Sequence, residues 1–168
     1  MDIYDLTVPQ LIRTLRNLDA TGQVYIRGHG AAGAWRIAQD REGQQVLEHT
    51  EVCDRLIRSG LPATFGGVIK FWNCESGLSS TGRTGKHRHS FAKRCADYLR
   101  DKGYRRCRYI GYTGTLSSYG EKDKRAFGDR AYHRAAWPAK GGKTRASEQQ
   151  LEILPPEGEP ELGLGDVL

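Results

Sequence analysis

The sequence contains no apolar run long enough to cross a membrane. Its first ten residues, MDIYDLTVPQ, are acidic and polar, and they lack the basic region and apolar stretch of a secretory signal. We therefore expect a cytoplasmic protein, with export by a specialised secretion system that reads no such signal as the alternative. No internal repeat is visible, and 168 residues are enough for one domain with a sizeable core.

Closely spaced metal ligands are also scarce. The chain has four cysteines: Cys53, Cys74, Cys95 and Cys107. None of them stands in a CxxC pair, and zinc sites are typically built on such close pairs. The nearest candidate is His87-x-His89, with Cys95 six residues later, so the sequence predicts no metal and no cofactor. Disulfides are not expected in a cytosolic chain, and Cys53, Cys95 and Cys107 are predicted to be small core residues.

Basic residues are absent from the C-terminal part of the chain. The 21 residues from Glu148 onward hold six of the 20 acidic residues and none of the 26 basic ones, so the part before them carries a formal charge of +12, against +6 for the whole chain. Most of this excess lies between Arg83 and Arg145. Such a region predicts contact with a polyanionic ligand, unless it is only a solvated face. No recognition helix or aromatic-interleaved segment favours nucleic acid, and no membrane partner is predicted.

Helical periodicity and apolar runs alternate along the chain, which predicts an α/β fold. The helical pattern of residues 8–18 ends before a first strand at 23–27. Before the strand at residues 23–27, no other strand is clear. Residues 34–38 and 44–48 flank a turn, and they form either a hairpin or a helix followed by a strand. Thr50 is expected to cap the next helix, which a strand over 68–73 follows.

The second half of the chain continues this pattern. Residues 78–89 form a long loop rich in glycine, serine, threonine and basic residues, which favours a functional or mobile segment. Ser90 caps a helix, a third parallel strand covers 106–112, and an edge strand is expected at 151–154. We therefore expect one domain over residues 1–154, built as a three-layer α/β/α sandwich with a small, mostly parallel sheet. Residues 155–168 read as an acidic flexible tail.

Two of the apolar runs end beside a reactive side chain. QVYIR (Gln23–Arg27) leads into GHG, with His29 at its centre, and VIKFWN (68–73) leads into Cys74. Apolar runs bounded by glycine are typical of buried parallel strands. The carboxyl ends of neighbouring parallel strands meet in one crevice, where open α/β sheets place their sites. We therefore predict that His29 and Cys74, 45 residues apart, lie on the same rim.

An imidazole and a thiol on one rim predict nucleophilic catalysis. A thiol is a poor nucleophile until it loses its proton, and an imidazole, which titrates near neutrality, accepts that proton. His29 is therefore the candidate base and acid, and Cys74 the candidate nucleophile. Glycines beside both residues let a substrate backbone approach the N–H groups of Gly30 and Cys74, the candidate oxyanion hole. The competing interpretation is a buried strand-end cysteine and a histidine that bonds a backbone carbonyl.

The blocks VYIRGHG and VIKFWNCESG resemble the caspase-like superfamily of cysteine peptidases, which includes caspases, clostripain, gingipain-type enzymes and the self-cleavage domains of large bacterial toxins. In that family, one hydrophobic block leads into His-Gly and a second leads into the nucleophilic cysteine. The segment SFAKRCADYLRDKGYRRCRYIGYTGTL is similar to the next helix and strand of the bacterial members. The resemblance covers roughly residues 8–116.

This resemblance implies a caspase-like fold and a cysteine endopeptidase with a His-Cys dyad, such as a bacterial effector or toxin-related protease that cuts a protein target. His29 is then the general acid, Cys74 the nucleophile and the Gly30 amide a part of the oxyanion hole, with no third catalytic residue. The toxin domains also imply an inositol polyphosphate as a ligand for the basic region. The family has a βαβ unit before the histidine strand, whereas this sequence predicts one helix and no strand there.

Two glycine motifs favour other functions. Gly28-His-Gly-Ala-Ala-Gly33 matches the dinucleotide fingerprint, but the segment after it is too short and polar for the helix that such a site needs. Residues 77–84 match a phosphate-binding loop with Arg83 in place of lysine, and a planar guanidinium does not freely replace the compact ammonium. The alternatives are therefore a nucleotide-binding α/β protein and a non-catalytic module that binds an anionic partner through its basic region.

Overall fold

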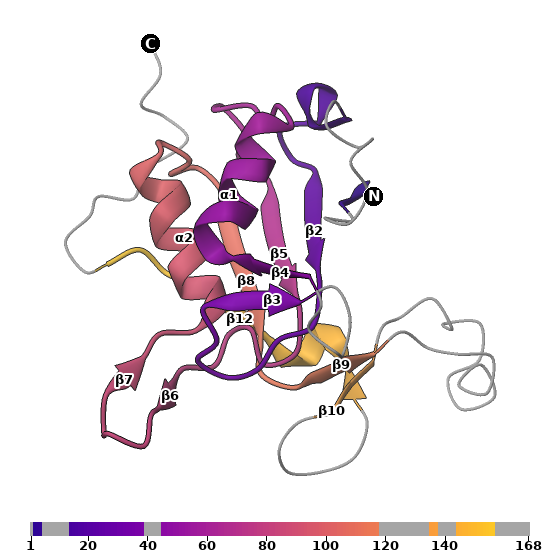
Figure 1. Cartoon of the computed structure of the whole chain (residues 1–168). Coiled ribbons are helices and arrows are strands. Elements are labelled where there is room, and N and C mark those ends of the chain that lie inside the picture. Colours follow the sequence, from indigo (N-terminus) through magenta and orange to yellow (C-terminus); the bar gives the residue numbers. More distant parts are fainter. Residues whose placement is uncertain (1, 5–13, 39–44, 118–134, 138–143, 157–168) are drawn as a thin grey trace.

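The computed structural model describes residues 2–4, 14–38, 45–117, 135–137 and 144–156. Its centre is a five-stranded sheet (Figure 1). The strands lie in the order β1 (Asp2–Tyr4), β2 (Gln23–Arg27), β5 (Val68–Trp72), β8 (Arg108–Tyr112) and β12 (Gln150–Glu152). The first four are parallel, and β12 runs antiparallel at the β8 edge. The predicted α/β fold with a small, mostly parallel sheet is confirmed.

The three predicted parallel strands form where apolar runs are buried within the sheet. In their register Val24 of β2 pairs with Ile69 of β5, which in turn pairs with Tyr109 of β8, and all three are fully buried. The predicted edge strand is β12, which begins one residue earlier than expected. The expectation of no strand before β2 is wrong, because β1 pairs in parallel with residues 24–26. The open edge of β2 offers unpaired backbone groups that even a three-residue strand satisfies.

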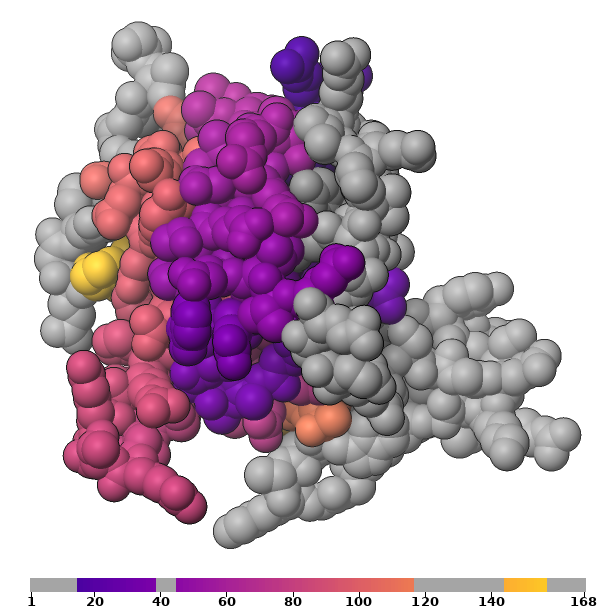
Figure 2. Space-filling view, in the orientation of Figure 1, coloured from indigo at the N-terminus to yellow at the C-terminus, as the bar shows by residue number. Residues whose placement is uncertain are grey.

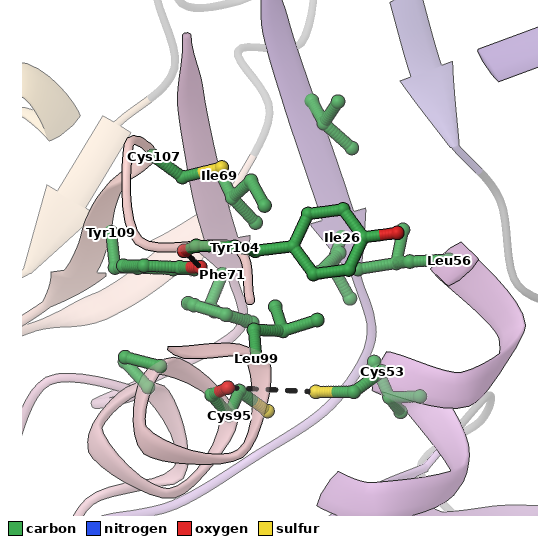
Figure 3. Packing of buried hydrophobic residues seen from close by; sticks show 14 of the residues in the cluster. Ile26, Cys53, Leu56, Ile69, Phe71, Cys95, Leu99, Tyr104, Cys107 and Tyr109 are labelled. Carbon is green, nitrogen blue, oxygen red and sulfur yellow. Dashed lines mark hydrogen bonds between the residues drawn. The ribbon is translucent and has the colours of Figure 1, made fainter. Parts of the chain in front are cut away.

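Two α-helices cover one face of the sheet (Figure 1). They are α1 (His49–Arg58) and α2 (Phe91–Asp101). Apolar side chains of both helices share one core with the strands (Figure 3). The members of this core include Val24, Ile26, Ile69, Phe71 and Tyr109 from the strands and Val52, Cys53, Leu56, Phe91, Cys95 and Leu99 from the helices. No helix among the described residues is long and apolar enough to span a bilayer.

Of the two predicted helix caps, the cap of α2 is confirmed and the cap of α1 is wrong. The Ser90 side chain accepts a hydrogen bond from the Lys93 N–H at 3.1 Å, so Ser90 caps α2 as expected. The cap predicted at Thr50 is wrong, because α1 begins at His49 and Glu48 occupies the cap position without a side-chain hydrogen bond. The hairpin that precedes α1 brings the chain to the helix in an extended conformation, so no side-chain cap is needed to set the boundary.

The remaining elements are short. They are η2 (Thr14–Asn17), β3 (Arg36–Ala38), β4 (Val46–Glu48), β6 (Ser80–Thr81), β7 (His87–Arg88), β9 (Thr115–Ser117), β10 (Ala135–Trp137), β11 (Thr144–Arg145) and η4 (Ala146–Gln149). They make three antiparallel sheets, β3–β4, β6–β7 and β9–β10–β11. The hairpin alternative for residues 34–48 is therefore confirmed, and the predicted loop over 78–89 contains the β6–β7 ribbon. Of the helix predicted over 8–18, residues 8–13 lie outside the described residues, as do residues 157–168 of the predicted tail.

Aromatic side chains occupy the face of the sheet opposite α1 and α2. The Trp72 ring lies between Tyr25 and Tyr112, with ring centroids 6.4 Å and 4.9 Å away. Ala146 of η4 and Leu116 of β9 pack against these three rings. Within the described residues, an α-helical layer covers one face of the sheet only. Of the three layers predicted for the sandwich, these residues form two, the sheet and one helical layer.

A buried arginine holds β12 in place. Arg100 of α2 is only 6% exposed, and its guanidinium donates to the carbonyls of Ile153 and Leu154. The same guanidinium lies 5.0 Å from the centroid of the Tyr109 ring. The segment that follows β12 is therefore fixed to the helical layer beside the start of β8, at the end of the sheet away from the loops of His29 and Cys74.

Candidate active site

The loops that follow β2 and β5 lie at the carboxyl end of the sheet. Arg27, the last residue of β2, pairs in parallel register with Trp72, the last residue of β5. His29 and Cys74 each stand two residues beyond this pair. The structure therefore places the imidazole-bearing loop and the thiol-bearing turn at the same end of two neighbouring strands.

Two contacts tie these loops together. Gly30 lies directly against the Asn73 side chain, since a Cβ atom added to Gly30 would be 2.4 Å from Asn73 Nδ2. The Ala32 N–H donates a hydrogen bond to Glu75 Oε2 at 3.2 Å. A residue with a side chain at position 30 would displace the Asn73 amide, so glycine allows the close approach of the two loops here.

Cys74 opens the turn after β5. Its side chain is partly buried, and the Leu116 N–H donates to Sγ at 3.4 Å, so the positive end of a backbone dipole points at the sulfur. Leu116 packs against the aromatic cluster, which brings the thiol to the aromatic side of the sheet. The next residue, Glu75, has φ of +53°, in the left-handed region that residues with a side chain rarely adopt. Its N–H donates to the Gly114 carbonyl at 3.0 Å, which holds the turn against the end of β8.

A buried serine fixes the base of this turn. Ser76 Oγ donates to the Phe71 carbonyl at 2.7 Å and accepts from the Tyr112 N–H at 3.0 Å. The Ser76 carbonyl accepts from the Ala92 N–H at 2.9 Å. One residue thus connects β5, β8 and the first turn of α2, so the position of the thiol is set by three elements.

One isolated antiparallel bridge joins His29 to Ala38, the last residue of β3. Its N–H donates to the Ala38 carbonyl at 2.7 Å, and its carbonyl accepts from the Ala38 N–H at 2.9 Å, while its side chain is exposed. A Cβ atom on the preceding Gly28 would contact Ile37 Cδ1 of the core at 3.1 Å. Side chains alternate along an extended backbone, so His29 faces the aromatic side, as the thiol does. Within the described residues, no hydrogen bond joins the His29 ring to the Cys74 thiol.

The two backbone groups predicted to bind an oxyanion have no acceptor among the described residues. In the part of the chain that the structure describes, neither the Gly30 N–H nor the Cys74 N–H donates to a protein acceptor. The neighbouring N–H groups of His29, Ala32, Glu75 and Ser76 all have acceptors. Free N–H donors therefore occur in both loops, one at each predicted position.

The other three cysteines are core residues, as predicted. Cys53, Cys95 and Cys107 are buried (Figure 3), and the Cys53 thiol donates to the Cys95 carbonyl at 3.7 Å. Burial raises the pKa of the Cys107 thiol to about 11 and raises the pKa of the Cys95 thiol well above its usual range. Of the four thiols, Cys74 alone is partly exposed.

Asn73 is the residue of this rim that the sequence did not single out. Its side chain is 1% exposed, and within the described structure neither Nδ2 nor Oδ1 has a hydrogen-bond partner. A buried amide without partners lowers the free energy of unfolding, by about 1–3 kcal/mol for each unpaired group. No signal in the apolar run VIKFWN indicates this burial, because the covering atoms come from Gly30, more than forty residues earlier.

We expect Asn73→Asp to destabilise the protein in a pH-dependent way. A buried carboxylate without a partner has its pKa raised above the value of about 3.9 for unfolded aspartate. The unfolded state then releases its proton first, so the free energy of unfolding falls by about 1.4 kcal/mol per pH unit from about pH 4 up to the raised pKa. Urea unfolding of variant and wild type at several pH values measures this difference.

The exposed Asn17 offers a matched control for this measurement. Asn17→Asp introduces the same carboxylate at the surface, where its pKa stays near the unfolded value, so its effect on unfolding is expected to be small and nearly independent of pH. Equal pH profiles for the two variants would show that the Asn73 side chain is solvated or paired in solution.

The two glycine motifs are not followed by the helices that a nucleotide site needs. The segment after Gly33 forms β3, and the segment after residues 77–84 forms β7 before α2 begins at Phe91. Both motifs depend on a helix N-terminus that faces the phosphates, so the geometry does not support the nucleotide-binding alternative. Among the residues described, no group of three or more His, Cys, Asp or Glu side chains is arranged to hold a metal.

Comparison with known proteins adds no relative. No protein-family model matches the chain, and no curated protein sequence matches it significantly. The resemblance to caspase-like peptidases therefore stays a prediction.

Proposed function

We propose that this protein is a cysteine endopeptidase of caspase-like, three-layer architecture that hydrolyses peptide bonds in a protein target. The observation that carries the proposal is the position of His29 and Cys74, two residues beyond the ends of paired parallel strands, in loops that contact each other. This rim is where open α/β sheets place their sites. Cys74 is also the one cysteine of the chain that is partly exposed.

In this proposal the Cys74 thiol passes its proton to the His29 imidazole, and Sγ attacks the carbonyl carbon of the substrate. A C–S bond forms, and the carbonyl oxygen takes up the negative charge. When the tetrahedral intermediate collapses, the C–N bond breaks and the His29 imidazolium protonates the leaving amine. Water then hydrolyses the thioester, which returns the thiol and releases the carboxylate product.

Three features of the rim support this chemistry. The unused N–H groups of Gly30 and Cys74 are the donors that an oxyanion would need, one from each loop. The Leu116 backbone positions the thiol, because its N–H donates to Sγ at 3.4 Å and its carbonyl accepts from Sγ at 3.9 Å. The left-handed Glu75 is a strained residue next to the nucleophile, and such backbone strain concentrates at functional sites.

The resemblance to the caspase-like superfamily supports the same function from the sequence side. It favours a bacterial effector or toxin-related protease, either cytoplasmic or exported, that cuts a protein or peptide substrate without a cofactor. It also assigns catalysis to two residues, His29 and Cys74.

Labelling with iodoacetamide tests the proposal most directly. At about pH 7, mass spectrometry should find Cys74 modified first, because Cys95 and Cys107 are buried with raised pKa values and Cys53 is buried in the same core. His29→Ala should slow the labelling of Cys74 under native conditions, since the acceptor of its proton is removed. A native protein in which Cys53, Cys95 or Cys107 reacts as fast as Cys74, or in which His29→Ala changes nothing, would contradict the dyad.

A second candidate function is a non-catalytic module of the same fold that binds an anionic partner. The observation that favours it is the exposed basic ribbon β6–β7, described below. The two candidates differ in the labelling result, because a binding module needs no reactive thiol.

A further inference from the structure

The β6–β7 ribbon is the most basic exposed segment of the described chain. It leaves the cysteine turn at Leu78 and ends at the cap of α2, and it projects from the body of the molecule (Figure 1, Figure 2). Gly85, with φ of +73°, makes the turn at its tip. The exposed residues of the ribbon are Ser79, Thr81, Arg83, Thr84, Gly85, Lys86, His87, Arg88 and His89.

Within the described residues, no carboxylate neutralises the charges of this ribbon. No acidic residue occurs in the sequence from Ser76 to Ala96. In the described structure, Arg83, Lys86 and Arg88 have no carboxylate within ion-pair distance, whereas Lys93 at the start of α2 is paired with Asp97. Three cations without a partner among the described residues therefore stand together on a short, exposed hairpin.

One face of the ribbon lies against the loop that carries His29. The Gly33 N–H donates to the Leu78 carbonyl at 2.8 Å, and a Cβ atom on Gly33 would lie 2.0 Å from Ser80 Oγ. Ser80 is paired with Arg88 across the ribbon, and paired residues of an antiparallel ladder project to the same face. Arg88, and Lys86 two residues before it, are therefore on the face of the ribbon next to the candidate active site.

We propose that the β6–β7 ribbon is an exosite that selects polypeptide substrates with a short run of aspartate or glutamate beside the cleavage site. The inference rests on the proposed function, because it assigns a substrate class to the same site. Residues 78–90 contain no Phe, Tyr or Trp, the His87 and His89 rings pack edge to face against each other, and the ribbon is too short to follow many phosphates. A few carboxylates on an extended peptide match the cations of the ribbon, of which Lys86 and Arg88 are on the face beside the His29 loop.

Peptide binding by the full-length Cys74→Ala protein tests this exosite without requiring turnover. Fluorescence anisotropy would compare a labelled peptide carrying three consecutive glutamates with the same peptide carrying three glutamines. At low salt we expect the acidic peptide to bind about tenfold more tightly, and added salt should remove the difference. The triple variant Arg83→Gln/Lys86→Gln/Arg88→Gln should abolish the preference.

A matched control separates the ribbon from net charge. Lys102, Arg105 and Arg106 are exposed and lie beyond the far end of α2, so Lys102→Gln/Arg105→Gln/Arg106→Gln makes the same charge change away from the rim. This control should keep the preference for the acidic peptide. Equal losses in both triple variants, or tighter binding of a single-stranded oligonucleotide of equal charge that the ribbon variant weakens, would overturn the proposal.

Cleavage assays distinguish the exosite from the proposed function itself. In the active protein, the ribbon variant should lower kcat/KM for an acidic reporter peptide about tenfold and leave a neutral reporter unchanged. Binding selectivity in Cys74→Ala together with no cleavage by the wild type would contradict the endopeptidase and leave the ribbon an acidic-peptide binding surface. Cleavage with no preference between the two reporters would contradict the exosite alone.

Discussion

Cys74→Ala and His29→Ala are each expected to abolish peptide cleavage while leaving the fold intact. Removal of a catalytic nucleophile or its base typically lowers kcat by a factor on the order of 10³ or more. His29 is exposed and Cys74 loses one sulfur atom at a partly buried position, so neither change removes core packing. Because the two residues act in one proton transfer, the double variant should keep as much cleavage activity as the less active of the two single variants. A pool of internally quenched peptides that covers all residues before the cleaved bond measures this, with thermal unfolding as the check on folding.

His87→Ala is the matched control for the histidine. His87 is also exposed, and it lies on the β6–β7 ribbon outside the proposed dyad. The His87→Ala variant should cleave neutral peptides at the wild-type rate. Near-normal turnover in both single dyad variants would show that His29 and Cys74 are structural, and cleavage by neither the wild type nor any variant would favour the binding module.

Gly111→Ala is expected to lower the free energy of unfolding by about 3 kcal/mol or more. The added Cβ atom would lie 2.6 Å from Gly77 Cα, 2.7 Å from Gly77 N and 2.9 Å from Ala92 Cβ. None of these atoms belongs to a side chain that can rotate away, so the backbone of β8, the cysteine turn or α2 must move. The same displacement should reduce the labelling rate of Cys74, because Gly77 is part of the turn that holds it.

Gly66→Ala provides the comparison for this substitution. A Cβ atom at Gly66 would have no heavy atom nearer than 3.7 Å, and its φ is not in the left-handed region, so its effect should stay within about 0.5 kcal/mol. Urea unfolding of the two variants gives the difference in free energy directly. If Gly111→Ala fails to accumulate as soluble protein, Gly111→Ala/Ala92→Gly, which removes one of the contacts, should recover part of the stability. Equal stability of Gly111→Ala and Gly66→Ala would mean that the turn and β8 are less closely packed than the structure shows.

Local sequence signals were sufficient for the central elements of the fold. The apolar runs of β2, β5 and β8 predicted three parallel strands, because runs of this length bury both faces of a strand. The Ser90 cap and the helical spacing of the apolar residues predicted α2 to within a residue of its start. These elements carry their own pattern, so they could be recognised without knowledge of their neighbours.

Other elements have no pattern of their own and form only on contact with the rest of the chain. The strand β1 has three residues, and it exists because the edge of β2 offers hydrogen bonds. The β6–β7 ribbon consists of glycine, serine, threonine and basic residues, and two ladder pairs turn an apparent loop into a hairpin. Hydrogen bonds between segments decided both cases.

The same distinction between local pattern and long-range contact applies to the candidate site. The sequence by itself determined that His29 and Cys74 follow strand ends. It also predicted that the glycines beside them let a substrate backbone approach, whereas the structure packs Gly30 against Asn73 and Gly77 against Tyr112. Only the tertiary structure decided that Asn73 is buried under Gly30 and that the Leu116 N–H reaches the Cys74 sulfur, 42 residues earlier in the chain. Strand periodicity depends on adjacent residues, whereas the surroundings of a side chain at the end of a strand depend on which distant loops the packed sheet brings together.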